Sequence, residues 1–128
     1  MIVDTSALVA IVIEEPGYAE PLDKLVALGR ARAGTPTLVE TGIVLRGRLG
    51  PAGRTLLSVT LDELSIEPLA FQAEHWPVAL DAFARFGKGR HPAALNFGDC
   101  LTYAVAKVAN EPLLCLGDDF AETDLELA

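Results

Sequence analysis

Four acidic positions of this 128-residue chain stand where carboxylates can do chemistry. They are Asp4, Glu40, Asp99 and Asp118. Asp4 and Asp118 each follow a short apolar run, where a buried strand would end, and Glu40 and Asp99 lie near the expected starts of helices. If the fold brings them together, they form an all-oxygen pocket of the kind that Mg²⁺ and Mn²⁺ prefer.

Such a pocket has a definite chemistry. One or two divalent ions can bind a phosphodiester oxygen, lower the pKa of a bound water and stabilise the leaving oxygen. No His or Cys accompanies the four acids, so a zinc site is not expected. The pattern therefore predicts a metal-dependent hydrolase, with nucleic acid as the favoured substrate.

Each acid also has a structural explanation when it is taken singly. Asp4 could cap the helix that follows it, and Glu40 could close a capping box begun at Thr37. Asp99 could complement a helix dipole behind an Asn96 cap, and the fourth acid could begin a surface turn. Taken together, several carboxylates at the edge of a core repel one another unless a cation neutralises them, which favours the metal site.

Short apolar strands alternate with helical patterns along the chain. Strands are predicted at 1–3, 30–34, 64–69 and 113–116, and helices at 7–13, 21–28, 35–49, 52–61, 71–86 and 99–109. This alternation indicates an α/β fold with a mostly parallel central sheet, in a single domain over residues 1–128. Ligands of such sheets collect beyond the carboxyl ends of the strands, where Asp4 and Asp118 fall.

Composition limits the class of protein. The net charge is -8, yet eight of the ten Lys and Arg residues fall within 30–54 and 85–90. An acidic pocket flanked by basic segments is compatible with a polyanionic substrate. Hydrophobic residues make up 51% of the chain, which argues against disorder. No apolar run reaches the roughly 18 residues of a membrane span, so a cytoplasmic protein without a membrane partner is expected.

Five segments follow one another in an order that matches a known family. They are Met-Ile-Val-Asp-Thr-Ser-Ala-Leu at 1–8, Leu-Val-Glu at 38–40, His-Pro-Ala-Ala-Leu-Asn-Phe-Gly-Asp-Cys at 91–100 with Tyr103-Ala104, Glu-Pro-Leu-Leu at 111–114, and Gly-Asp-Asp-Phe at 117–120 with Thr123-Asp124. On this ordered set the chain resembles the PIN-domain ribonucleases, specifically the VapC-type toxins of bacterial toxin–antitoxin pairs. It departs at the fourth acid, where many PIN domains carry one Asp and this chain offers Asp118, Asp119 and Asp124.

The resemblance implies a PIN-like fold of three layers and an endoribonuclease that depends on Mg²⁺, for which Mn²⁺ may substitute. The residues that it implies as both catalytic and metal-binding are Asp4, Glu40, Asp99 and Asp118. It also implies an RNA substrate, a homodimer, and a cognate antitoxin protein that silences the toxin.

Six residues beside the acids are predicted to contact the substrate: Thr5, Ser6, Lys88, Arg90, His91 and Asn96. Helix capping is the favoured role for the hydroxyls and for the Asn96 amide, with a substrate contact as the alternative. The basic loop at 87–92 is read equally well as a solvated connection and as a phosphate contact. His75 and Trp76 are expected to pack within their helix.

Two other classes of protein remain as alternatives. A phospho-accepting signalling domain also places acids at strand ends, but it usually has an adjacent acidic pair early and a Lys on a late strand. Here the first acid stands alone and no Lys follows Leu113. A binding-only module with a PIN fold is the second alternative, and the presence of all four acids argues against it.

Overall fold

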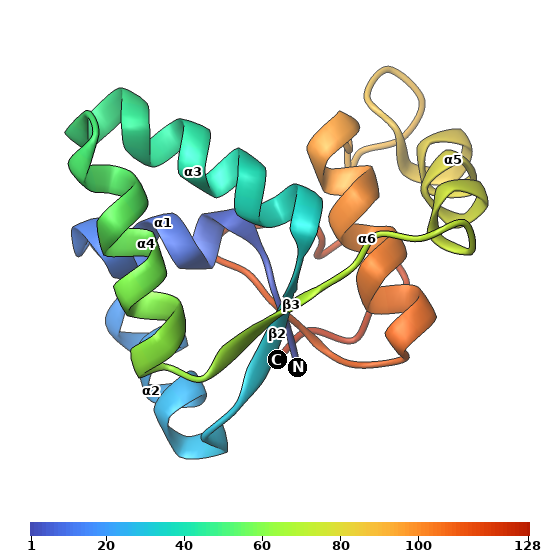
Figure 1. Cartoon of the computed structure of the whole chain (residues 1–128). Coiled ribbons are helices and arrows are strands. Elements are labelled where there is room, and N and C mark those ends of the chain that lie inside the picture. Colours follow the sequence, from blue (N-terminus) through green and yellow to red (C-terminus); the bar gives the residue numbers. More distant parts are fainter.

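The computed structural model describes all residues from 1 to 128 and contains one sheet with helices on both sides (Figure 1). The strands are β1 (Ile2–Val3), β2 (Ala31–Gly34), β3 (Ile66–Leu69) and β4 (Leu113–Leu114). The helices are α1 (Thr5–Ile13), α2 (Ala19–Leu28), α3 (Thr35–Leu49), α4 (Ala52–Glu63), α5 (His75–Phe86) and α6 (Phe97–Ala109). All strand pairs are parallel, in the spatial order β3-β2-β1-β4.

The central strands are buried on both faces because helices cover both sides of the sheet. In Figure 1, α1 to α4 lie on one side of the strands and α5 and α6 on the other. Ile2 and Leu113 join the core formed with α5 and α6, whereas Val3 and Leu114 join the core formed with α1 and α2. This alternation follows from the pleat, which points successive side chains to opposite faces. The predicted α/β fold with three layers is confirmed.

The strand order brings the two ends of the chain together. β1 lies inside the sheet between β2 and β4, and Val3 pairs with Leu114. The Asp4 amide continues this pairing by donating to the Leu114 carbonyl over 2.9 Å. The residues that follow β1 and β4 therefore leave the sheet side by side, at the carboxyl edge where α/β proteins bind ligands.

Two of the acids begin helices. Asp4 Oδ2 accepts from the Ser6 amide over 3.1 Å, so α1 starts at Thr5 and its cap is Asp4, not Thr5 or Ser6. At α6 the Asn96 side chain accepts from the Asp99 amide over 2.9 Å, and Asp99 Oδ2 accepts from the Asn96 amide over 3.0 Å. This reciprocal pair is a capping box, which confirms the structural roles predicted for Asp4 and Asp99. Each bond uses only one oxygen of its carboxylate.

The structural explanation for Glu40 is wrong. α3 begins at Thr35 with Pro36 in its first turn, a position that suits a residue without an amide hydrogen. Thr37 therefore lies inside the helix and cannot open a capping box for Glu40. The Glu40 side chain is left without a role in helix capping.

The predicted helix 71–86 is shorter than expected at its start. Residues 71–74 instead precede the helix, with a turn at 73–74. The Gln72 amide donates to His75 Nδ1 over 2.9 Å, and Phe71 stacks on the His75 ring. His75 is buried as predicted, but Trp76 is 61% exposed, so the prediction that it packs is wrong. None of the six helices combines the length and the apolar character needed to cross a bilayer.

Candidate active site

Asp4 is held in one orientation at the end of β1. Its side chain is buried, with 6% exposure. Ser6 Oγ donates to Asp4 Oδ2 over 2.7 Å and accepts from the Leu116 amide over 3.0 Å. Ser6 therefore ties the carboxylate to the segment after β4. No protein group donates to Asp4 Oδ1, which leaves that oxygen for another partner.

Glu40 reaches across from α3 to the first turn of α6. Its carboxylate lies against Gly98, where a Cβ would overlap Glu40 Oε2. Any larger residue at 98 would push this side chain away, so the glycine permits the close approach. Glu40 is thereby held beside the residue that precedes Asp99. In the sequence, Gly98 stands out only as part of a motif, because no neighbouring residue indicates the contact with α3.

Asp99 carries the clearest electrostatic signature. Its pKa is raised from the usual 3.8 to about 6, first by burial and then by the negative charges of Asp4, Asp119 and Glu40. The hydrogen bond from the Asn96 backbone opposes this rise but does not cancel it. Carboxylates from three other segments thus act on Asp99 at this edge of the sheet. A nearby cation would stabilise the ionised form of Asp99.

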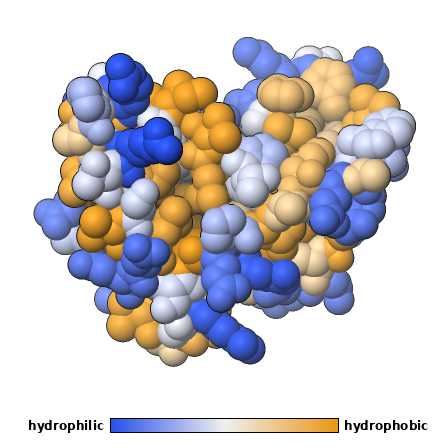
Figure 2. Space-filling model, in the orientation of Figure 1, coloured by the Kyte–Doolittle hydropathy of each residue, from blue (hydrophilic) through white to orange (hydrophobic).

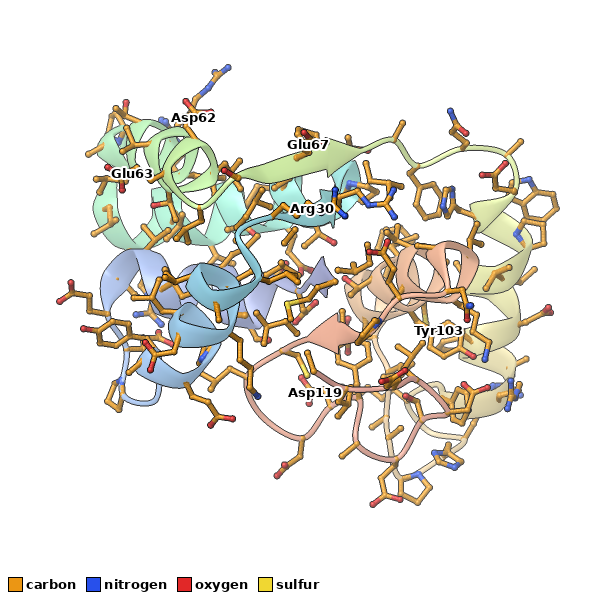
Figure 3. The ribbon with its side chains drawn as sticks, turned by 90° about the horizontal axis from the view of Figure 1, so that it is seen from below. Arg30, Asp62, Glu63, Glu67, Tyr103 and Asp119 are labelled. Carbon is orange, nitrogen blue, oxygen red and sulfur yellow. The ribbon has the colours of Figure 1, made fainter.

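The fourth carboxylate that acts on Asp99 is Asp119, whereas the sequence pointed to Asp118. Figure 3 shows Asp119 on the loop that follows β4. The charge of Asp118 contributes instead to the raised pKa of Cys115, and it does so less than burial, Asp4 and Asp119. Both aspartates are exposed, and their order of influence supports Asp119 as the fourth acid.

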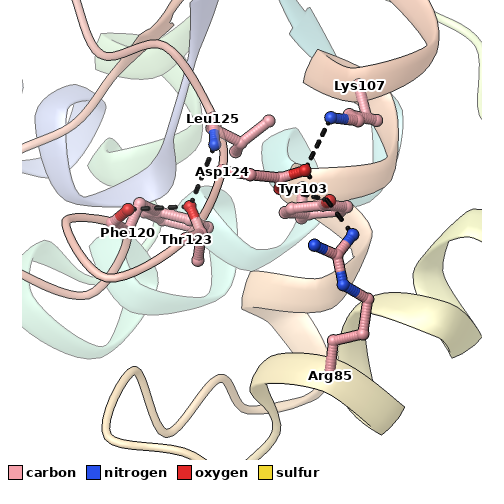
Figure 4. Close-up of polar contacts among 7 residues, drawn as sticks. All are labelled: Arg85, Tyr103, Lys107, Phe120, Thr123, Asp124 and Leu125. Carbon is pink, nitrogen blue, oxygen red and sulfur yellow. Dashed lines mark hydrogen bonds and ion pairs between the residues drawn. The ribbon is translucent and has the colours of Figure 1, made fainter.

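Asp124 is occupied elsewhere. Its carboxylate accepts from the Tyr103 hydroxyl over 2.6 Å and from Lys107 Nζ over 2.8 Å, with Arg85 at 3.5 Å (Figure 4). Hydrogen bonds from Lys107 and Tyr103 lower the pKa of Asp124 to about 2. Burial is the largest reason that the pKa of Tyr103 rises to about 12, followed by its bond to Asp124. Asp124 therefore anchors the C-terminal tail to α6, and its carboxylate is already engaged by three side chains.

The donor chemistry of the site fits a hard divalent cation. As the side chains stand, no three His, Cys, Asp or Glu groups lie close enough together to hold one ion among them. Mg²⁺ needs no such cage, because it binds through one or two carboxylates and fills its octahedron with water and substrate phosphate. The negative charges that, after burial, raise the pKa of Asp99 are what such an ion would offset.

Four of the six predicted substrate contacts have partners within the protein. Ser6 is engaged with Asp4, Asn96 caps α6, and Thr5 Oγ1 donates to the Thr37 carbonyl over 3.4 Å. His91 Nδ1 accepts from the Ala93 amide, and its ring meets the edge of the Phe86 ring. The cap at Asn96 is the role that the sequence predicted for it. A contact of the four residues with substrate stays a prediction.

Lys88 and Arg90 are exposed and their side chains make no hydrogen bond or ion pair, although the Arg90 guanidinium lies over the Phe83 ring, 5.6 Å from its centre. Their loop is closed at its base, where the Lys88 amide donates to the Leu95 carbonyl and the Leu95 amide donates to the Phe86 carbonyl. In Figure 1 the loop, drawn from yellow to orange, stands at the same end of the molecule as the start of α6. Asp99 lies in that first turn, so the two basic side chains are carried on the side of the acids.

Comparison with known proteins decides the family. Residues 1–126 match the family model of the PIN domain. The chain belongs to the PIN-domain family. It is 48% identical over 131 residues to ribonuclease VapC36 of Mycobacterium tuberculosis, covering 98% of this chain and 91% of that one. It is 44% identical over 126 residues to ribonuclease VapC of Mycolicibacterium smegmatis, covering 98% and 97%.

Two solved structures share the fold at low identity. The Mycobacterium tuberculosis VapC20 toxin, described as cleaving the sarcin-ricin loop, has a TM-score of 0.78 at 16% identity and covers 99% of this chain and 97% of its own. Rickettsia felis VapBC2, bound to a DNA fragment from its promoter, has a TM-score of 0.73 at 16% identity and covers 99% and 96%. The predicted PIN-like fold and the prediction of a VapC-type toxin ribonuclease are confirmed.

The raised pKa of Asp99 makes a prediction for this PIN domain without metal. Asp99→Asn should raise the free energy of unfolding at pH 7.5 by up to about 1 kcal/mol, a small value because the group is half exposed. A carboxyl whose pKa rises from 3.8 to about 6 on folding stabilises the fold below pH 4 and loses that contribution as the pH passes 6. The gain should therefore vanish below about pH 4 in urea unfolding with chelator.

Asp124→Asn is the matched control, with the opposite sign. Its lowered pKa means that the ionised carboxylate stabilises the fold above pH 4, and this contribution is lost as the pH falls towards 2. The variant should be less stable than wild type at pH 7.5, and the difference should shrink in acid. An Asp99→Asn variant that is less stable than wild type at pH 7.5 would contradict the electrostatic account of the site.

Proposed function

We propose that this PIN-domain protein is the toxin of a type II toxin–antitoxin pair that cuts RNA phosphodiester bonds in the cytoplasm with Mg²⁺, for which Mn²⁺ can substitute. The observation that carries the proposal is the raised pKa of Asp99 under the charges of Asp4, Glu40 and Asp119. Isolated helix caps would not gather four carboxylates at one edge of a sheet. The names of the similar proteins, ribonuclease VapC among them, point to RNA as the substrate.

The local contacts of each of the four acids suggest a different role for it. Asp4 and Asp99 each have one oxygen fixed by a helix-capping bond and the other available, so they are the pre-oriented cation ligands. Glu40 and Asp119 would complete the site from its two sides. A bound divalent cation would supply stabilisation of phosphate charge and activation of water. Asp119, which is exposed at the edge of the site, would accept the proton that the attacking water gives up.

Cleavage assays on acid variants test this assignment. Asp4→Asn and Asp99→Asn should each lower the rate of RNA cleavage by at least about 100-fold, because a lost ligand displaces the ion. Asp119→Asn should lower the rate by about 10-fold or more, and its neighbour Asp118→Asn, the matched control, should change it by less than about threefold. Excess chelator should abolish wild-type cleavage, and Mg²⁺ or Mn²⁺ should restore it.

Three results would change the proposal. Full activity in Asp99→Asn, or cleavage that persists in chelator, would remove the metal-dependent mechanism. Loss of activity in Asp118→Asn with activity kept in Asp119→Asn would return the fourth role to Asp118, as the sequence predicted. Binding of RNA without any cleavage under all cations would favour the binding-only PIN module.

The exposed basic loop is proposed to bind the RNA backbone and to take no part in the chemistry. Replacing Lys88 and Arg90 together by Ala should weaken RNA binding and reduce the slope of log affinity against log salt by about one to two. Single-turnover cleavage at saturating RNA should change little, because uniform binding leaves the chemical barrier unaltered. The matched control replaces Arg46 and Arg48 at the far end of α3. If only the control variant changes the slope, the RNA path runs along α3.

An antitoxin is proposed to occupy a groove between α3 and α4. The groove has a volume of about 520 Å³, an apolar floor that includes Leu38, Leu57 and Leu61, and Arg46 and Arg54 along it. α4 packs closely against α3 along this groove. Figure 2 shows apolar surface over α3. An amphipathic helix with acidic residues beside its apolar face would complement this lining.

A homodimer is proposed to form through α5. Its outer face carries Trp76, Leu80 and Phe83, which are 61%, 62% and 39% exposed and lie one helical turn apart. Two copies of α5 packed antiparallel would bury this stripe against itself, as a two-fold interface requires. The same arrangement would place Glu74, before the start of each helix, near Arg85 in the last turn of the other.

Two surface substitutions separate these partners. Arg54→Glu should prevent co-purification with the product of the adjacent gene and leave the dimer intact, because it reverses one charge in the groove. Leu80→Asp should give a monomer by light scattering and leave antitoxin capture intact, because it places a charge at the centre of the α5 stripe. Wild-type protein that captures no neighbour-encoded protein, with toxicity unrelieved, would count against the toxin assignment.

A further inference from the structure

Four threonine hydroxyls link the helices that carry the acids. They are Thr5 on α1, Thr37 and Thr41 on α3, and Thr102 on α6. Thr37, Thr41 and Thr102 are buried, with exposures of 4%, 0% and 1%. Neither the capping of the helices nor the proposed chemistry uses the last three. The other buried polar or charged residues are Asp4 and His75, and the rest of the interior is apolar or glycine.

The hydroxyls bond to one another across the helix interfaces. Thr37 Oγ1 and Thr102 Oγ1 are 3.0 Å apart and join α3 to α6. Thr41 Oγ1 donates to the Thr37 carbonyl over 2.8 Å within α3. Thr5 Oγ1 lies 3.4 Å from both that carbonyl and Thr41 Oγ1, which extends the chain of contacts to α1.

Each bonded threonine lies one helical turn or less from an acid. Thr37 precedes Glu40 by three residues, and Thr102 follows Asp99 by three. Residues three apart share one face of a helix, so the faces that meet through the two threonines are the faces that present the two acids. Thr5 directly follows Asp4. The bond between Thr37 and Thr102 therefore fixes α3 against α6 one turn below the carboxylates.

A pair of hydroxyls is energetically less favourable than a pair of apolar side chains at the buried interface of α3 and α6, unless the two hydroxyls bond to each other. A buried hydroxyl without a partner costs free energy, whereas two valines would fill nearly the same volume without any polar group. What the hydroxyls add is direction, since a hydrogen bond holds two oxygens at about 2.8 Å with a preferred angle and apolar contact does not. Compared with two valines, the hydroxyl pair is harder to accommodate in the core, but it fixes the distance between α3 and α6.

We propose that Thr37 and Thr102 are positioning residues that set the separation of Glu40 and Asp99 and thereby the affinity of the site for its divalent cation. The inference rests on the proposed function, because it takes the acids as cation ligands. It concerns only this chain's own residues, and no contact between the threonines and the ion is implied. A change of a few tenths of an ångström between α3 and α6 would be passed directly to the carboxylates.

The test is calorimetric titration of RNA-free protein with MnCl₂, together with unfolding measured in chelator. Thr102→Val leaves Thr37 unpaired and should lower stability in chelator and weaken Mn²⁺ binding by about 10-fold. The double variant Thr37→Val/Thr102→Val removes both partners, so its metal-free stability should return to near wild type. Its Mn²⁺ affinity should stay about 10-fold weak, because the directional bond is still missing. Thr102→Ser should restore both properties.

The matched control is Leu25→Val, which loosens the core beneath α2, a helix that carries none of the acids. It should lower stability without changing Mn²⁺ affinity. A double valine variant that binds Mn²⁺ as tightly as wild type would overturn the inference and leave the proposed function standing. A wild-type protein without measurable binding of Mn²⁺ or Mg²⁺ would overturn both, whatever the variants do.

Discussion

The repulsion among carboxylates at the carboxyl edge of the sheet is the constraint on which the rest of the structure depends. Burial and three like charges raise the pKa of Asp99 to about 6, so the folded protein holds an arrangement that is unfavourable without a counter-ion. The free energy for this comes from the two apolar cores that clamp β1 and β4 from both faces. The fold already holds these carboxylates near Asp99 before any cation binds. A cation would therefore meet ligands that are already in place, which is how a rigid fold preorganises charge.

Each carboxylate is kept in place by a different local device. Asp4 and Asp99 are fixed by the helices that they cap, and Ser6 joins Asp4 to the segment after β4. Glu40 depends on the missing side chain of Gly98. Asp119 sits on the loop after β4, where the next residue, Phe120, is buried and Asp124 further on anchors the tail to α6 (Figure 4). The hydrogen bonds that cap the helices thus also orient the carboxylates of the site.

The fold was largely predictable from the sequence because its signals are local. Apolar runs, the Pro36 helix start and the Asn96 cap gave every strand and helix, with ends displaced by a few residues. The site was predictable only in part. Asp4, Glu40 and Asp99 could be named because each stands in a distinctive motif, but the choice between Asp118 and Asp119 depends on a loop whose course is set by tertiary contacts. Trp76 was misplaced because helical periodicity does not say which apolar face is covered.

The charge distribution explains how an acidic protein can act on RNA. With a net charge of -8, the chain as a whole repels a polyanion, and its exposed acids add to the repulsion at the site itself. Attraction must therefore be local. Lys88 and Arg90 extend from a loop that stands beside the first turn of α6, and a divalent cation would reverse part of the negative field at Asp99. RNA would then be drawn only to the metal-loaded edge, so the same ion that supports cleavage would also decide where the substrate binds.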